Sequence, residues 1–593
     1  MADVEESFAS RLKSDLSRIK DFLVENENII NAHNVDFFTK DLWNTCLPKG
    51  IRDDLDKLSV EEVASLPSLF LQGMENPEGC SSGVLKQCSN LVDLLSRVRS
   101  VHLRSFPHVQ EGQYFKRGLD IVGKHASALS SFMMSPKKAY EVDVMSQAVH
   151  DLVQRTKVDK VVDLGSGKGY LSQYLALKHG IPVLGIDSRE SNTMNAEKRN
   201  EKTLKVWHSL LKRSQNQENS YSRTKESCSQ YVVDHSNDTS LGAVSLGSDN
   251  VPESWESSST VDNSSSSSSS NDMHPYSSSK KISIGHCEDG NIQNTVLPGK
   301  DDIPDKDVQK SCLKTIETSK HDSYLPVTAH VSSSAQIYQN LEALFEKKNT
   351  SICNDINKGI ILVGLHTCGD LAPTAINIFI KDSVVKALCL VGCCYHLLSQ
   401  PTDSETPIEM EENMQSCEGL EAEHGFPLSD FLKQQNFRVS RNATMVAQQA
   451  ADRIASECKI PAPSIFYRAV LQVILKEKLG LDTTGMHVGR IGAKCKTFTE
   501  YIHKSFKRLG LENKMISDEE IQAYYRRFQD REREIRAFHQ LRACIAPCIE
   551  SVFLMDRLCY LHEKGMTNAR IVAMFDPVKS PRCYAIIASK TSC

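Results

Sequence analysis

The residues best placed to hold a ligand form one short glycine-rich segment. A buried apolar run at 160–164 is followed directly by Gly165-Ser166-Gly167-Lys168-Gly169. Glycine permits tight turns and lets a ligand approach the backbone closely. We call residues 165–169 the glycine loop. Because the loop follows a strand, the sequence predicts a ligand site at the carboxyl edge of a sheet.

The spacing of the glycines separates three kinds of site. The pattern is G-x-G-x-G, because Tyr170 stands where the G-x-G-x-x-G dinucleotide fingerprint has its third glycine. A P-loop is excluded, since Lys168 is followed by glycine and the earlier glycine would fall at Val162. The pattern therefore favours S-adenosyl-L-methionine (SAM), which has no pyrophosphate to seat on a helix N-terminus.

Two carboxylates stand close to this loop in the predicted strands. Asp187 ends the next strand, 18 residues after Gly169, where an acid can accept both hydroxyls of a ribose. Asp163 can position the cofactor through backbone amides, water or the ammonium of its methionine part. The predicted cofactor-binding residues are Asp163, Gly165, Ser166, Gly167, Gly169 and Asp187.

Further polar and thiol groups follow two later apolar runs, at 359–365 and 387–391. These groups are His366, Cys368, Asp370, Cys393, Cys394, Tyr395 and His396. The carboxyl ends of neighbouring strands converge on the ligand in a doubly wound sheet. We therefore expect these side chains to lie together, near the glycine loop.

Four roles are open for this second group. His366 or Asp370 could act as a general base toward a hydroxyl or amine, and the Cys368 thiolate as a nucleophile on a pyrimidine ring. The thiols and imidazoles could bind zinc, but the usual C-x₂₋₄-C spacing is missing, and we assign no metal site. The most frequent role of such residues is to shape the pocket, since free cysteine is usually buried. His366, Cys368 and Asp370 are the catalytic candidates.

The elements that must position these residues alternate between strands and helices. Strands at 160–164 and 182–187, each followed by a helix, indicate a parallel sheet. Additional strands are predicted at 327–331, 359–365, 387–391, 569–575 and 582–588, with a helix at 545–564 before the last two. The expected fold is α/β, a Rossmann-like class I SAM-dependent methyltransferase with a seven-stranded sheet that ends in a hairpin.

The predicted domain organisation interrupts this sheet twice. A Ser-rich segment with seven consecutive serines cannot bury enough apolar surface to offset its ordering entropy, so it is expected to be disordered. The expected parts are a helical N-terminal region (1–125), the methyltransferase domain in two parts (126–212 and 321–424), the disordered insertion (213–320), a helical insertion (425–545), and the last helix with the C-terminal strands (546–593).

Composition restricts the setting in which the chain works. The 593 residues carry a net charge of −5, and no apolar run approaches the ~18 residues of a membrane span. The first residues lack the apolar core of a signal peptide. We therefore expect the 19 cysteines to be reduced thiols of an intracellular protein, cytoplasmic or nuclear.

Four sequence segments together resemble a known family. They are D-L-G-S-G-K-G, G-I-D-S, G-L-H-T-C-G-D-L and C-C-Y-H. The chain resembles the methyltransferase-like protein 25 family, which includes a relative named for a ribosomal RNA adenine dimethylase domain, and more distantly tRNA 2'-O-methyltransferases. The resemblance implies SAM-dependent methyl transfer, and it implies that Asp163, Gly165, Gly167, Gly169 and Asp187 line the SAM pocket. It fixes no substrate.

The methyl acceptor is less well defined by the sequence. Amine-directed nucleic-acid methyltransferases carry a D/N-P-P-Y element where this chain has His366-Thr-Cys-Gly-Asp370. Residues 490–542 hold 13 Lys and Arg against 8 Asp and Glu, with Tyr524 and Tyr525 beside arginines, which suits RNA contact. We favour RNA or a ribonucleoprotein slightly over protein as the acceptor. The alternative is a SAM-fold pseudoenzyme that acts as a binding or scaffold subunit, with the helical N-terminal region as its partner surface.

Overall fold

The computed structural model describes most of the chain outside the Ser-rich segment. The described residues are 2–75, 83–111, 134–207, 209, 323–346, 359–401, 424–481, 486, 488, 489, 491–514 and 516–590. The predicted insertion at 213–320 lies outside them, as does the acidic stretch 402–420. Residues 1–219 and 314–593 belong to one structural unit. Within the described residues, no helix combines the length and the apolar character that a membrane span requires.

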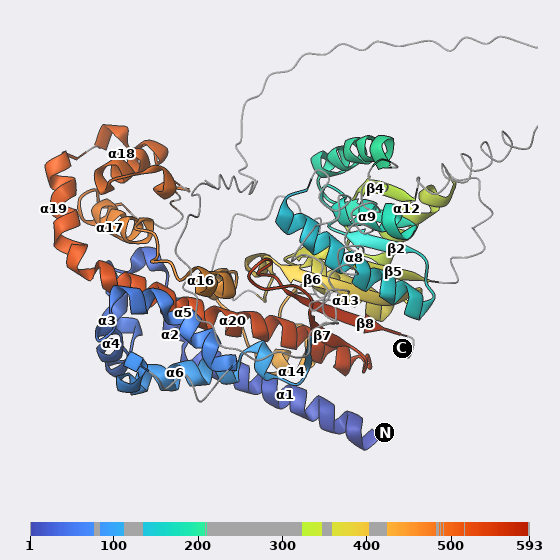
Figure 1. The fold of residues 1–593 in the computed structure, drawn as a ribbon, viewed down its shortest axis with the longest axis horizontal. Helices are drawn as coiled ribbons and strands as arrows, with labels where there is room; N and C mark the ends of the chain where they lie inside the picture. The colour runs from blue at the N-terminus through green and yellow to red at the C-terminus, as the bar shows by residue number, and fades with distance from the viewer. Residues whose placement is uncertain are drawn as a thin grey trace, which may run out of the picture. The chain divides into compact units, whose positions relative to one another are not determined.

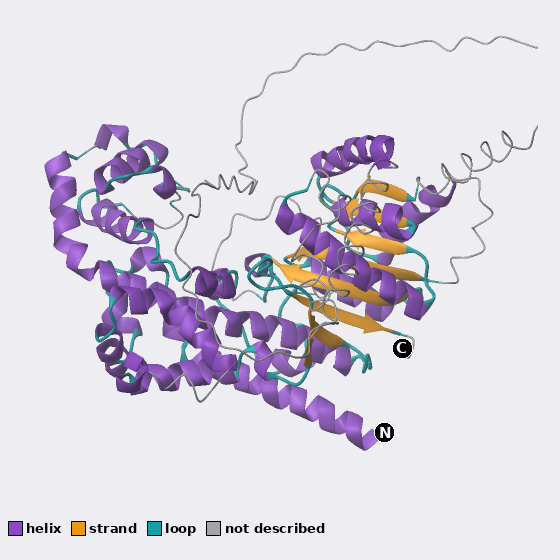
Figure 2. Ribbon diagram, in the orientation of Figure 1, coloured by secondary structure: helices purple, strands orange, loops and turns teal. Residues whose placement is uncertain are grey.

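A single mixed sheet forms the centre of this unit (Figures 1 and 2). Its eight strands among the described residues lie in the order β1-β7-β8-β6-β5-β2-β3-β4. Their bounds are β1 (Val109–Glu111), β2 (Val161–Leu164), β3 (Val183–Asp187), β4 (Tyr324–Thr328), β5 (Ile360–Cys368), β6 (Val385–Cys393), β7 (Arg570–Ala573) and β8 (Tyr584–Ser589).

The pairing of the strands confirms the predicted α/β fold class. Strands β4, β3, β2, β5 and β6 are parallel neighbours, and β8 is antiparallel to both β6 and β7. The order reverses direction after β2, which lies between β3 and β5. In such sheets the ligand crevice lies outside the carboxyl ends of the strands at this reversal. The glycine loop follows β2 and therefore lies at this point.

The sheet has one strand more than the seven we predicted. β1 pairs in parallel with β7, with Val109 opposite Ile571, and so extends the edge beyond the C-terminal hairpin. This strand falls within residues 1–125, which were expected to be helical. Three residues, Val-Gln-Glu, are too short to show a periodicity of two, so the sequence pattern could not reveal it.

The β4 strand begins three residues before the predicted position at 327. It includes Pro326, which lies opposite Gly185 in the β3–β4 pairing. Proline cannot donate to a sheet ladder and is confined to edge strands. β4 is the last strand of the sheet on its side, so Pro326 is compatible with this position. The prediction missed the start because proline argues against a strand in the sequence.

The helices next to the site begin and end at residues suited to helix termini. They are α8 (Pro136–Thr156), α9 (Tyr170–His179), α12 (Ser334–Glu346) and α13 (Leu371–Lys381), together with a helical stretch at 190–207. The Ser135 hydroxyl caps α8 and Pro136 occupies its first turn. Gly180, in the left-handed region, ends α9. α8 packs on α9 and on β5 and β6, while α13 packs on β5, β6 and α20 (Glu532–Glu563).

The N-terminal region is helical and packs along one long C-terminal helix. Its members are α1 (Ala2–Glu25), α2 (Glu27–Asn31), α3 (Leu42–Cys46), α4 (Lys49–Asp56), α5 (Val60–Glu75) and α6 (Ser89–Ser100), with short 3₁₀ turns between and after them. α1 and α5 both pack on α20, which is drawn in red beside these blue helices in Figure 1. Most residues of α20 from Ala537 onward are buried. The N-terminal helices therefore share one hydrophobic core with the end of the chain.

The described residues between 425 and 545 form mainly helices. The helices are α14 (Asp430–Lys433), α15 (Arg441–Val446), α16 (Ala451–Glu457), α17 (Ser464–Glu477), α18 (Phe498–Arg508) and α19 (Asp518–Phe528). The final helix, which we predicted to begin at Ile545, is instead α20 and begins at Glu532. The sequence pattern did not reveal that α20 is continuous, because mixed charges precede Ile545 and a proline, Pro547, follows it. Pro547 is accommodated within the helix.

One buried carboxylate on α20 anchors the segment that leads into α14. Asp556 is completely buried and accepts hydrogen bonds from the Leu428 amide at 2.7 Å and the Ser429 amide at 3.0 Å. The Ser429 hydroxyl also donates to it, at 2.5 Å. These bonds join the helical insertion to the core around α20.

We expect Asp556→Ala to lower the free energy of unfolding by about 3 kcal/mol, because two buried amides lose their acceptor. Urea unfolding should show a lower midpoint with an unchanged slope. The control is Asp430→Ala, which removes an exposed carboxylate paired with Lys564 and should cost less than about 1 kcal/mol. Equal effects of the two substitutions would contradict the anchoring role of Asp556.

Candidate functional site

The glycine loop adopts a conformation that only glycine tolerates well. Gly165, Gly167 and Gly169 have φ values of 69°, 56° and 68°, all in the left-handed region. The amides of Gly165 and Ser166 donate to the Ile186 carbonyl at 2.9 and 3.0 Å. The loop is therefore fastened to the end of β3 rather than free to move away from it.

Asp187 completes this attachment. Its Oδ2 accepts a hydrogen bond from the Gly167 amide at 2.9 Å, and its Oδ1 accepts from the Arg189 amide and the Asn192 side chain, each at 2.9 Å. A carboxylate offers about four acceptor positions in all, so Oδ2 keeps capacity for a further donor. The structure thus brings Asp187 to the glycine loop, as its position in the sequence predicted.

Asp163 lies beneath the loop. Its side chain is buried, and Oδ2 accepts a hydrogen bond from the Ser172 hydroxyl of α9 at 2.6 Å. Burial, with a contribution from the nearby Asp187 carboxylate, raises the pKa of Asp163 to about 7. In this arrangement Asp163 joins β2 to α9 directly below the loop.

The surroundings of the loop fit an adenosyl ligand. A Cβ added to Gly167 would meet no atom within 4 Å, so the backbone there faces open space. A Cβ at Gly169 would lie 2.2 Å from the Tyr324 hydroxyl, so β4 closes the loop on that side. The hydroxyls of Ser166 and Tyr324 are buried and lie near each other, and neither makes a well-aligned hydrogen bond to a described residue. Buried polar groups without a partner are uncommon and call for a ligand or a water.

His366, the first catalytic candidate, is held by a buried acid. Its Nε2 lies 3.1 Å from Oε2 of Glu141, a residue of α8 with no exposed side-chain surface. The Ser580 hydroxyl and the Lys138 ammonium also donate to Glu141, each at 2.8 Å. Burial alone would raise the pKa of Glu141, but the hydrogen bond and charge of His366, with the Lys138 charge, hold it well below its usual range.

Sequence reasoning missed Glu141 as a site residue. Its signal was an acid among buried apolar positions of the predicted helix, Tyr140 and Val142 on either side. In the structure Lys137 and Lys138 lie 3.5 and 2.8 Å from the Glu141 carboxylate.

Asp370 is placed differently from His366. Its Oδ1 accepts a hydrogen bond from the Ser399 amide at 2.9 Å. Gly425 approaches so closely that a Cβ there would lie 1.8 Å from the same oxygen. The Asp370 carboxylate therefore holds the backbone at Ser399, and the Gly425 amide is held in turn by the Ser399 hydroxyl at 2.9 Å.

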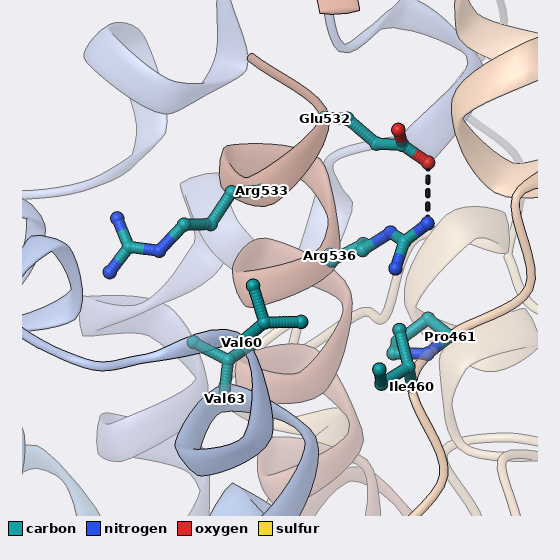
Figure 3. Close-up of a pocket in the computed structure, with 7 residues that line it drawn as sticks. All are labelled: Val60, Val63, Ile460, Pro461, Glu532, Arg533 and Arg536. Carbon is teal, nitrogen blue, oxygen red and sulfur yellow. Dashed lines mark hydrogen bonds and ion pairs between the residues drawn. The ribbon is translucent and has the colours of Figure 1, made fainter. Parts of the chain in front are cut away.

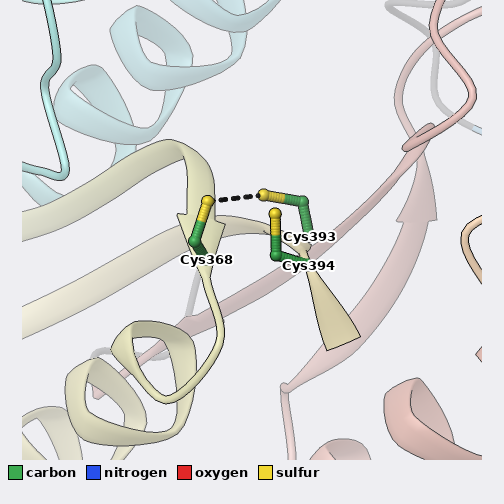
Figure 4. Close-up of side chains that lie close together, drawn as sticks. All are labelled: Cys368, Cys393 and Cys394. Carbon is green, nitrogen blue, oxygen red and sulfur yellow. Dashed lines mark hydrogen bonds between the residues drawn. The ribbon is translucent and has the colours of Figure 1, made fainter. Parts of the chain in front are cut away.

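The thiols of Cys368, Cys393 and Cys394 come together from two strands (Figure 4). The Sγ atoms of Cys368 and Cys393 are 3.1 Å apart, and all three sulfurs lie within 4.8 Å of one another. Hydrogen bonds from the other two thiols lower the pKa of Cys394, and the nearby imidazoles of His366 and His396 add to the effect. The hydrogen bond with Cys393 lowers the pKa of Cys368. The hydrogen bond with Cys394 and burial act in the opposite direction, and the pKa of Cys368 is raised to about 11.

The remaining residues of this group serve the core. Tyr395 is buried, donates to Glu550 at 2.9 Å and stacks on Phe553 at a centroid distance of 4.9 Å. His396 Nδ1 is hydrogen-bonded to the Gln448 side chain. Tyr395 and His396 therefore have structural contacts, unlike the clustered thiols at the same strand ends. The sequence alone did not distinguish these two groups of residues.

A small cavity lies in a different part of the chain, where α5 and α20 meet the residues that follow α16 (Figure 3). It encloses about 150 Å³ and is lined by Val60, Val63, Ile460, Pro461, Glu532, Arg533 and Arg536. Its cations are already engaged: Arg536 donates to Glu532 at 2.5 Å and Arg533 to the Leu55 carbonyl at 2.8 Å. The cavity therefore offers no free charge to a ligand.

Comparison with known proteins decides the family. A protein-family profile described as a methyltransferase domain matches residues 137–401. "Probable methyltransferase-like protein 25" of Homo sapiens is 32% identical over 617 residues, covering 98% of this chain and 97% of the relative. The chain belongs to the methyltransferase-like protein 25 family. The protein of the same name from Mus musculus is 32% identical over 627 residues, with the same shares covered. No solved structure matches the chain significantly.

Family membership confirms the resemblance inferred from the sequence and the methyltransferase class of enzyme. The profile match includes the glycine loop, Asp187, Glu141 and both cysteine-bearing strand ends, because all lie within 137–401. The match extends through the undescribed insertion as well. The chain is therefore a methyltransferase-family enzyme, whose domain contains all the candidate residues described above.

We expect Glu141→Gln to lower the free energy of unfolding by about 3 kcal/mol at pH 7. The substitution removes the buried negative charge with which His366 and Lys138 interact. The pKa of Glu141 is lowered by folding, so its contribution is complete above the ordinary value of 4.5 and is lost as the pH falls through the folded value. The difference in free energy of unfolding between wild type and Glu141→Gln should therefore begin to decrease below pH 4.5.

Urea unfolding at pH 7 and at pH 4 measures this dependence. The control is Glu197→Gln, which neutralises an exposed acid of the 190–207 helix and should change stability little at either pH. A loss for Glu141→Gln that stays constant with pH would contradict an ionised Glu141.

Proposed function

We propose that this chain binds SAM at the glycine loop and transfers its methyl group to an acceptor. The observation that carries the proposal is the loop of three left-handed glycines in which Gly167 bonds to Asp187 and faces open space. SAM supplies an electrophilic methyl group, so the protein has mainly to position the reactants and accept a proton.

Each loop residue has a defined part in holding the cofactor. Asp187 Oδ2 accepts a ribose hydroxyl while it keeps its bond to the Gly167 amide. Gly167 leaves the backbone open to close approach by the ligand, whereas Gly165 makes room for the Leu371 side chain. The Ser166 hydroxyl, buried without a well-aligned hydrogen bond, is available to a polar group of the ligand. Asp163 acts from below by holding the loop's strand against α9.

His366 is the proposed general base. Its Nε2 is engaged by Glu141, and Nδ1 has no hydrogen-bond partner among the described residues. An imidazole held by a buried carboxylate is fixed in its orientation, which is the usual arrangement of a base with its positioning residue. The loop lies beside it, because a Cβ at Gly165 would come within 3.6 Å of the His366 carbonyl.

The other two catalytic candidates are less suited to this role. A thiol whose pKa is raised to about 11 has little thiolate at neutral pH, which argues against Cys368 as a nucleophile in this state. Asp370 Oδ1 is bonded to the Ser399 amide and is closely approached by Gly425, which suits a structural carboxylate better than a general base. Both remain candidates for shaping the acceptor side of the pocket.

For the acceptor we propose RNA or a ribonucleoprotein. The net positive charge of residues 490–542 supports this class. Part of that charge is neutralised within the protein, since Arg527 pairs with Glu477 at 2.7 Å and Arg531 with Asp41 at 2.7 Å. Tyr525 packs against Phe466 and Phe498, so it is a core residue rather than a stacking platform. RNA contact would therefore rest on the cations outside these pairs.

Calorimetric titration of SAM into the full chain tests the proposed site. Gly167→Arg should abolish binding, because the side chain fills the open space over the loop while it meets no protein atom. The matched control is Gly180→Arg, at the end of α9. Gly180 has a similar φ of 65° and equally open surroundings, so it imposes the same backbone strain away from the loop.

Asp187→Ala should weaken SAM binding by roughly 10- to 100-fold, the usual loss for charge-assisted hydrogen bonds. If both Gly167→Arg and Asp187→Ala bind SAM as tightly as wild type, SAM does not bind at the glycine loop. Binding without methyl transfer to any cellular RNA or protein would favour the pseudoenzyme scaffold instead. No SAM binding by a folded wild-type chain would contradict the proposal.

A further inference from the structure

The three clustered cysteines carry no chemical step of the proposed methyl transfer. Cys368 ends β5, Cys393 ends β6, and the two are direct partners in the parallel pairing of these strands. Cys394 follows at once. Figure 4 shows the three side chains turned toward one another from the two strand ends.

The backbone is distorted at both strand ends in a way that gathers the sulfurs. Adjacent residues of a strand point to opposite faces, so Cys393 and Cys394 would normally diverge. Cys394 instead has a φ of 51°, in the left-handed region, which is uncommon for a residue with a side chain. This conformation allows both thiols to approach Cys368 within 4.8 Å. Strained residues of this kind concentrate at functional sites.

The β5 strand shows a second irregularity just before Cys368. The β5–β6 register shifts between Gly364 and Thr367, after which Thr367 pairs with Gly392 and Cys368 with Cys393. Such bulges redirect side chains and are frequent beside active sites. The Thr367 hydroxyl donates to the Val391 carbonyl at 3.0 Å and fixes the new register.

The sulfur positions match those of a metal site. Three thiolates on a tetrahedral zinc ion, with Zn–S bonds of about 2.3 Å, lie about 3.8 Å apart. The observed 3.1 Å separation and the 4.8 Å limit bracket that spacing. Among the described residues, no fourth histidine, cysteine or acid ligand atom joins the cluster. Each of the two nearby imidazoles has one nitrogen engaged elsewhere, His366 Nε2 with Glu141 and His396 Nδ1 with Gln448.

We propose that Cys368, Cys393 and Cys394 bind one Zn²⁺ ion and leave its fourth position open. Thiolate ligands select zinc over the hard cations magnesium and calcium. Zinc sites with three protein ligands and an open position are catalytic in type, whereas structural sites have four protein ligands. Cys368 is exposed, so the open position is accessible from solvent.

The zinc site is independent of the proposed SAM site but shares its edge of the sheet. Each thiol that becomes a ligand releases its proton to solvent. The metal then acts as a Lewis acid on whatever donor occupies the fourth position, lowering its pKa. The sequence spacing did not indicate this site, because the three ligands meet only through the pairing of β5 with β6.

Metal analysis of the full chain, purified under reducing conditions without chelators, provides the test. Wild type should contain about one zinc per chain. Cys368→Ser and Cys393→Ser should weaken zinc affinity by more than ~100-fold, since loss of even an outer-shell partner typically costs 10- to 100-fold. The matched control is Cys458→Ser, which replaces an exposed thiol outside the cluster and should leave the zinc content unchanged.

Titration of wild type with Co²⁺ gives a second measurement that needs no variant. Tetrahedral thiolate–cobalt bands should appear, and added imidazole should shift them by entering the open position. Wild type that holds no zinc and shows no such bands would overturn the proposal, as would zinc content unaffected by both cluster substitutions. A Cys368–Cys393 disulfide in the reduced preparation would also overturn the proposal. Cobalt bands that do not shift when imidazole is added would show that the fourth position is not open.

Discussion

The proposed site depends on the attachment of the glycine loop to the end of β3. The Ile186 carbonyl and the Asp187 carboxylate accept the amides of Gly165, Ser166 and Gly167, so two neighbouring strand ends move as one unit. A loop of glycines alone would carry a large conformational entropy. Fastening it before any ligand arrives removes much of that cost from binding. The acid that serves the ribose is thus also the acid that shapes the loop.

The same edge of the sheet gathers the remaining chemistry through buried supports. Glu141 reaches His366 from α8 and is held in turn by Lys138 and by Ser580 near the C-terminus. The C-terminal segment after α20 therefore helps to position a group near the end of β5. On the other side of β5, its register shift and the left-handed Cys394 bring three thiols together. Base and thiol cluster are independent structures built on one strand.

Local patterns predicted the central part of the fold well. Strands β2, β3, β5 and β6 are continuous apolar runs, and the glycine loop and Asp187 stand where their spacing indicated. Features that depend on distant pairing could not be seen. β1 has three residues and forms only because β7 lies beside it, and α20 keeps Pro547 inside a helix because the surrounding core holds it. Glu141 is recognisable only once α8 is known to face His366.

Hydrogen exchange of the full chain with and without SAM tests the central claim most directly. The account predicts that SAM slows exchange in peptides covering residues 163–170 and 185–192, where the loop amides and the Asp187 turn would be covered, while α18 and α19 stay unchanged. Protection confined to other regions, such as the cavity between α5 and α20, or no protection at saturating SAM, would contradict it.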